Sequence, residues 1–125
     1  MLIVKKLLTK VLSLAVNPSS ATIASGLSGE VYYMHFGRLC VVSGIVNTTG
    51  ALSAGAVLVT GLPSIYTNAG NFALRATNNS SASENVDLYF SADGEIRNRF
   101  ALSSASRSLR FCTAYLTRNV GGGTA

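Results

Sequence analysis

Residues 30–47 read EVYYMHFGRLCVVSGIVN and decide the fold class. Two runs rich in β-branched and aromatic residues flank Gly37-Arg38, a two-residue loop whose leading glycine suits a type II′ hairpin turn. The predicted register places Phe36 opposite Leu39, so that one face carries Tyr32, Met34, Phe36, Leu39 and Val41, and the other carries Tyr33, His35, Cys40 and Val42. Both faces are apolar. We therefore expect this hairpin to be covered once by its own domain and once by a partner chain.

A second hairpin is predicted over residues 84–102, with Ala92-Asp93-Gly94 as its turn. A two-residue loop would mix core residues with arginines across the strands. A three-residue loop with Gly94 at positive φ avoids this. It pairs Phe90 with Ile96, Leu88 with Asn98 and Val86 with Phe100, and on the opposite face it sets Tyr89 beside Arg97 and Asp87 beside Arg99.

Three further strands are predicted, at 54–60, 71–77 and 107–118, which brings the total to seven with no helical period between them. This pattern indicates an all-β fold, an antiparallel β-sandwich or barrel. The 125-residue length favours one domain. Hydrophobic residues make up 48% of the chain and charged residues only 12%, which argues against a coiled coil and against a disordered chain.

The N-terminal residues 1–16 have Ile3, Leu7, Val11 and Leu14 at helical spacing. Three lysines make the segment too polar for a transmembrane span, and Lys10 interrupts the apolar core that a signal peptide needs. We favour a short helical stub that packs against copies of itself or against the body. The chain then divides into the stub and a linker (1–25), a β-domain (26–118) and a flexible tail (119–125).

The composition provides little chemistry for catalysis or cofactor binding. His35 and Cys40 could form a nucleophilic dyad, but no orienting carboxylate or amide donor completes it. The carboxylates around the second hairpin are accounted for by the turn and by arginine partners rather than by a glycosidase pair. Cys40 and Cys112 fit buried free thiols, and no metal or cofactor motif is present. Of the net charge of +5, Lys5, Lys6 and Lys10 supply three, so nucleic-acid binding is not favoured.

The order of these motifs resembles a known family. The segments YYMHFGRLCVVSGIV, VLVTGLPSIY, VDLYFSADGEIRNRF and TAYLT are similar, in this order, to the C-terminal head domain of bacteriophage tail fibres and baseplate receptor-binding proteins. The resemblance implies a jelly-roll-like β-sandwich head that follows a stem, assembles as a homotrimer and binds saccharide on the host cell surface. The N-terminal stub then corresponds to the end of a helical stem.

The leading hypothesis is therefore a non-enzymatic adhesin in the virion tail, made in the host cytoplasm, which binds host polysaccharide and other tail or baseplate proteins, without nucleic acid or membrane insertion. The alternative is a purely structural virion component, a fibre knob or capsid decoration, that binds only protein. Aromatic platforms and arginines suit saccharides. The predicted saccharide site is Tyr66, Asp87, Tyr89, Arg97 and Arg99. The predicted trimer contacts are Ile3, Leu7, Val11, Leu14, Tyr33 and Val42.

Overall fold

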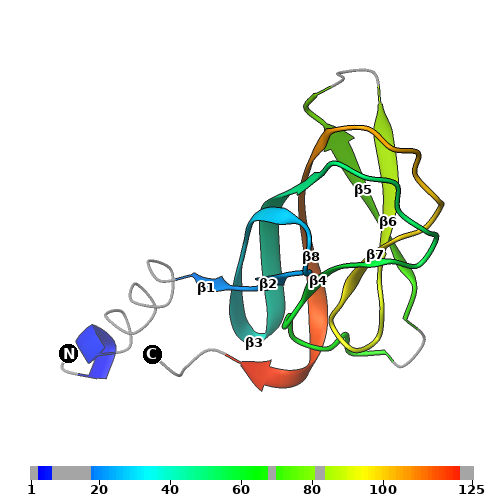
Figure 1. Cartoon of the computed structure of the whole chain (residues 1–125). Coiled ribbons are helices and arrows are strands. Elements are labelled where there is room, and N and C mark those ends of the chain that lie inside the picture. The colour runs from blue at the N-terminus through cyan, green and yellow to red at the C-terminus, as the bar shows by residue number, and fades with distance from the viewer. Residues whose placement is uncertain (1–2, 7–17, 68–69, 81–83, 122–125) are drawn as a thin grey trace.

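The computed structural model describes residues 3–6, 18–67, 70–80 and 84–121. Residues 3–6 are helical, and the other elements are strands: β1 (Ser19–Ser20), β2 (Thr22–Ile23), β3 (Ser28–Thr48), β4 (Val57–Thr60), β5 (Phe72–Asn78), β6 (Asn85–Phe90), β7 (Ile96–Asn98) and β8 (Arg107–Gly121). They form one antiparallel sheet in the order β1-β3-β8-β5-β6-β7-β4-β2 (Figure 1). The all-β prediction is confirmed. Within the described ranges, no helix has the length and apolar character needed to cross a membrane.

The segment that holds β1 and β2 nearly closes the sheet on itself. β1 pairs with β3 at one edge, through Ser19 and Tyr33, while β2 pairs with β4 at the other edge, through Ile23 and Val59. Only Ala21 separates the two strands, and its N–H donates to the Val31 carbonyl at 2.8 Å. These residues fall within the predicted linker, so that prediction was wrong here. The pairings of β1 with β3 and of β2 with β4 are only two residues long and depend on tertiary contacts, so the local sequence does not predict them.

The 21-residue β3 folds back on itself as the predicted first hairpin. Its first half pairs with β1 and its second half with β8. A methyl group added to Gly44 would lie 2.6 Å from the Glu30 carbonyl oxygen, whereas in a straight strand these residues would be about 45 Å apart. Figure 1 shows that β3 reverses its direction. Gly37 has a φ of 53° and Arg38 has no positive φ, as a type II′ turn requires.

The second hairpin has the predicted register over most of its length. Phe90 pairs with Ile96, Tyr89 with Arg97 and Leu88 with Asn98. The Ser91 N–H donates to the Glu95 carbonyl, so the loop has three residues, and Gly94 has a φ of 83°. The predicted pair of Val86 with Phe100 does not form, because β7 ends at Asn98 and the Phe100 side chain is exposed.

The sheet encloses one hydrophobic core, to which β3 and β8 each contribute one face. Val42 is completely buried in this core, and Tyr33 packs against it. Val42 is therefore unavailable to another chain, so its prediction as a trimer contact was wrong; Tyr33 lies on the same inner face. The outward face of β3 and β8 leaves several apolar side chains exposed, namely Tyr32, Leu39, Val41 and Leu116. Cys40 is buried as predicted, but Cys112 is exposed on this outer face, because successive strand residues alternate sides.

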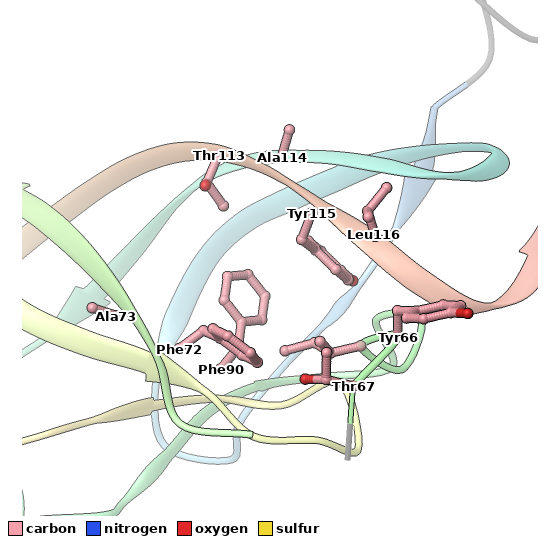
Figure 2. Close-up of a pocket in the computed structure, with 10 residues that line it drawn as sticks. Tyr66, Thr67, Phe72, Ala73, Phe90, Thr113, Ala114, Tyr115 and Leu116 are labelled. Carbon is pink, nitrogen blue, oxygen red and sulfur yellow. The ribbon is translucent and has the colours of Figure 1, made fainter. Parts of the chain in front are cut away.

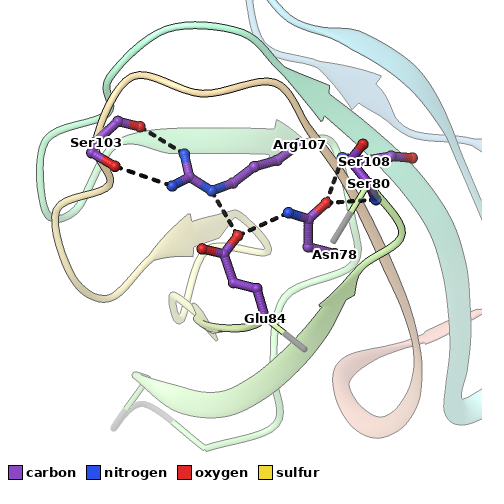
Figure 3. A network of polar contacts seen from close by, with 6 residues as sticks. All are labelled: Asn78, Ser80, Glu84, Ser103, Arg107 and Ser108. Carbon is purple, nitrogen blue, oxygen red and sulfur yellow. Dashed lines mark hydrogen bonds and ion pairs between the residues drawn. The ribbon is translucent and has the colours of Figure 1, made fainter. Parts of the chain in front are cut away.

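A network of polar side chains joins β5 to β8 where the two strands pair (Figure 3). The buried Arg107 guanidinium donates to Glu84 Oε1 at 2.8 Å and to the Ser103 carbonyl at 2.6 Å. Asn78 Nδ2 donates to the same Glu84 oxygen at 2.8 Å, while its Oδ1 accepts the backbone N–H groups of Ser80 and Ser108. This Arg107 network satisfies a buried charge and joins the last residues of β5 to the first residues of β8.

Candidate functional site

Strands β5 and β8 are paired over only a small part of their length. The ladder between them consists of Thr77 with Arg110 and Asn78 with Leu109. Beyond these pairs β5 continues to pair with β6 as far as Phe72, and β8 continues to pair with β3 as far as Leu116 and beyond. The two strands therefore separate, and a gap opens in an otherwise continuous sheet.

The gap is the mouth of an aromatic cleft of about 370 Å³, a size typical of small-ligand sites. The cleft is lined by Ile65, Tyr66, Thr67, Phe72, Ala73, Phe90, Thr113, Ala114, Tyr115 and Leu116. Figure 2 shows Tyr115 projecting from β8 between the phenylalanine rings on one side and Tyr66 on the other. None of the lining side chains is charged. Such a cleft suits a neutral ligand with an apolar face.

The loop after β4 forms the outer rim of the cleft. Its backbone is tied to β8, because the Tyr66 N–H donates to the Leu116 carbonyl at 2.9 Å and Ile65 bridges to Thr117. The Tyr66 ring is 56% exposed. The Arg38 guanidinium lies 5.3 Å from its centroid, a cation–π contact, and also donates to the Thr117 and Arg118 carbonyls. An exposed ring held by a loop and an arginine is a ready stacking platform.

Tyr115 forms the inner wall of the cleft and is held on both sides. Its ring centroid lies 4.9 Å from that of Phe90, and its hydroxyl donates to the Pro63 carbonyl at 2.8 Å. Burial, together with the neighbouring Cys40 thiol, raises the pKa of Tyr115 above its usual range. Burial also raises the pKa of Cys40. Both groups therefore stay neutral near pH 7, and the Cys40 thiol is poorly suited to act as a nucleophile.

Four of the five predicted saccharide-binding residues lie away from this cleft, on the outer face of the second hairpin. Asp87 and Arg99 line a shallow outer hollow of about 580 Å³ together with Ala73, Leu74, Arg75, Leu88 and Phe100. The side-chain pairs there differ from those that the sequence predicted, which were Asp87 with Arg99 and Tyr89 with Arg97. Asp87 pairs with Arg75 at 3.4 Å, and the ring of Tyr89 is covered by Arg99 at 5.5 Å. Arg97 instead binds Glu95 Oε1 at 2.7 Å and the Gly55 carbonyl.

The structure thus separates Tyr66 from the other predicted site residues and joins it to residues that the sequence analysis did not select. Phe72, Thr113 and Tyr115 belong to strands that the sequence predicted, but nothing local indicates that β5 and β8 part beside them. Of the predicted stem contacts, Ile3 is exposed, and Leu7, Val11 and Leu14 lie outside the described residues. In the described part of the chain, no cluster of three or more His, Cys, Asp or Glu residues could hold a metal ion.

Comparison with known proteins bears on the fold. No protein-family model matches the sequence, and no curated protein matches it. Among solved structures, the architecture is that of a phage receptor-binding protein. The match is to the crystal structure of the receptor binding protein (gp15) of Listeria phage PSA, with a TM-score of 0.59 and 22% sequence identity, covering 91% of this chain and 75% of that chain. The resemblance inferred from the sequence motifs is confirmed at the level of the fold.

Proposed function

We propose that this chain is the head of a receptor-binding protein in a bacteriophage tail fibre or baseplate, which attaches the particle to saccharide on the host cell surface without enzymatic activity. The observation that carries the proposal is the aromatic cleft, present in a fold that a phage receptor-binding protein shares. A sugar presents both an apolar face and hydroxyl groups. The cleft offers aromatic rings with the hydroxyls of Thr67, Thr113 and Tyr66 around them.

Attachment through weak individual sites requires several copies, and we propose that the head is a homotrimer. The support is the apolar outer face of β3 and β8, where Leu39 and Leu116 are neighbours across the ladder and are 44% and 61% exposed. Such a surface suits a contact with further copies of the same chain. Three linked copies would raise apparent affinity by about 10² to 10⁴ if they engage one surface together.

The cleft is tested by the binding of the purified chain to bacterial envelope polysaccharides. Tyr66→Ala removes the aromatic ring on which the apolar face of a sugar would pack, and we expect it to weaken binding about tenfold, or about 1.4 kcal/mol, with an unchanged melting temperature. The matched variant is Tyr89→Ala combined with Arg99→Ala on the outer face of the second hairpin, where Arg99 covers the Tyr89 ring, and it should bind as the wild type does. The opposite result, loss in the outer hollow and none in the cleft, would move the site to the hairpin that the sequence suggested.

The same preparation separates the alternative functions. A chain that docks on phage particles but binds no envelope polysaccharide would be a structural component that contacts only protein. Shortening of the polysaccharide during incubation would indicate an enzyme. Light scattering tests the assembly: we expect about 39 kDa, three times the chain mass of 13.0 kDa, and a monodisperse 13.0 kDa species would contradict the trimer.

A further inference from the structure

The walls of the aromatic cleft are two strand edges whose backbone groups face each other across the gap. In an antiparallel strand, successive residues direct their N–H and C=O groups to alternate sides. On β8, the Leu116 carbonyl accepts from the Tyr66 N–H, and Arg110 pairs with Thr77 of β5. Every second residue between them therefore directs its backbone N–H and C=O groups away from β3 and toward the gap. These residues are Cys112 and Ala114.

The same reasoning applies to the opposite wall. The Asn79 N–H donates to the Ser108 carbonyl, and Thr77 pairs with Arg110, so Arg75 and Ala73 direct their backbone groups toward β8. Had the strands stayed together, Arg75 would pair with Cys112 and Ala73 with Ala114. The ladder instead ends at Thr77, which leaves amide donors and acceptors on both walls. Ala73 and Ala114 both line the cleft.

Ala73, Cys112 and Ala114 are exposed, so water satisfies their backbone groups in the free protein, and a ligand that displaces this water must offer equivalent hydrogen bonds. A group that fits between two such edges must present one N–H donor and one C=O acceptor on opposite sides, as a peptide unit does. The floor between the walls is apolar, formed by Phe72, Phe90 and Tyr115, and the lining is uncharged. An acetamido group has this chemistry: an amide with a donor and an acceptor, and a single methyl group for the apolar floor.

We propose that the aromatic cleft binds a 2-acetamido sugar, with its amide hydrogen-bonded between the β5 and β8 edges, its methyl group on the Phe72–Phe90–Tyr115 floor and its pyranose ring against Tyr66. This inference rests on the proposed function and names the class of sugar that the same site selects. A plain hexose can pack against Tyr66 and use its hydroxyls, but it lacks the methyl group that fits the floor and the amide that matches both edges. We expect acetamido sugars to bind about tenfold more tightly than the matching hexoses, the lower end of the selectivity that one extra methyl-sized group gives in an apolar pocket.

The first test is an NMR titration of the full-length, ¹⁵N-labelled chain with three matched pairs: N-acetylglucosamine, N-acetylgalactosamine and N-acetylmannosamine against glucose, galactose and mannose. We expect at least one acetamido sugar to shift the backbone amides of Ala73, Cys112 and Ala114, and its matching hexose to shift them only at concentrations about tenfold higher. Phe72→Ala should abolish the difference. Phe100→Ala, which removes an exposed ring from the outer hollow, is the control and should preserve it.

A second test keeps the inference separate from the proposed function. An envelope polysaccharide that the chain binds is chemically N-deacetylated, and half of it is then re-N-acetylated. Loss of binding on deacetylation with recovery on re-acetylation supports the inference. Binding that depends on Tyr66 but survives deacetylation overturns the acetamido assignment and leaves the proposed function standing, whereas no binding to any envelope polysaccharide overturns both.

Discussion

Strands β5 and β8 meet at one end of the molecule and part at the other, and the two ends differ in chemistry. At the paired end, the Arg107 network joins the strands through hydrogen bonds and one ion pair (Figure 3). At the open end, aromatic rings face a cleft and the strand edges have no ladder between them (Figure 2). At the paired end, charged and polar side chains join the two strands. At the open end, apolar side chains and backbone amides remain accessible to a ligand.

The contrast between the two ends shows how a small β-domain can keep a gap in its sheet. An unpaired edge tends to pair or to close unless something holds it apart. Here the loop that carries Tyr66 lies on one side of the gap and its backbone is hydrogen-bonded to β8, while the Arg107 network joins the two strands at the other end.

The largest effect is expected at the paired end from Arg107→Ala. The change leaves Glu84 and the Ser103 carbonyl without their Arg107 donors and removes a buried side chain, so we expect a loss of about 2 kcal/mol in the free energy of unfolding, measured by urea denaturation. Arg75→Ala breaks an exposed ion pair on the same strand and should cost less than about 0.5 kcal/mol. Equal losses in the two variants would show that the network does not hold the strands.

At the open end, Tyr115→Phe removes the hydroxyl that donates to the Pro63 carbonyl. We expect a loss of about 1 kcal/mol in stability, since one buried hydrogen bond is removed and an acceptor is left. The rim loop should also loosen, and saccharide binding should weaken severalfold. Tyr32→Phe, on the exposed outer face, is the matched control, and a comparable effect there would contradict the role of the hydroxyl in holding the rim.

The smallest effect is a pH dependence at the paired end. Hydrogen bonds from Arg107 and Asn78 lower the pKa of Glu84 below its usual value of about 4.3. Stability from this group is thus present above the unfolded pKa of about 4.3, and it is lost as the pH falls below that value and through the lower folded pKa. Thermal melting of Glu84→Gln across this range should decline less steeply than that of the wild type. Parallel curves would mean that Glu84 contributes no such linkage.

The local sequence was sufficient to predict both hairpins, because turn glycines and alternating apolar residues act within a few positions of each other. Gly37 and Gly94 took the predicted turns, and Phe90 met Ile96 as expected. What the sequence did not reveal depends on contacts between distant segments. Ser19 pairs with one edge of the nearly closed sheet and Ile23 with the other. Similarly, Arg99 rather than the predicted Arg97 covers the Tyr89 ring.

The candidate site was predicted only at Tyr66. Turn residues surround Tyr66 in the sequence, and an exposed aromatic ring in a loop can be predicted from such a pattern. The rest of the cleft arises where two correctly predicted strands separate and the rim loop, distant from β8 in sequence, pairs with β8 instead. No periodicity within β5 or β8 distinguishes Phe72 and Tyr115 from ordinary core residues.

Amide hydrogen exchange along β5 and β8, with and without a bound envelope polysaccharide, tests the central claim most directly. We predict slow exchange at Thr77 and Arg110 in both conditions, and fast exchange at Ala73, Cys112 and Ala114 that becomes slow when the saccharide binds. Protection at Cys112 and Ala114 equal to that at Arg110 in the free protein would show that the strands are joined there, and amides that stay unprotected with the saccharide bound would show that it binds elsewhere.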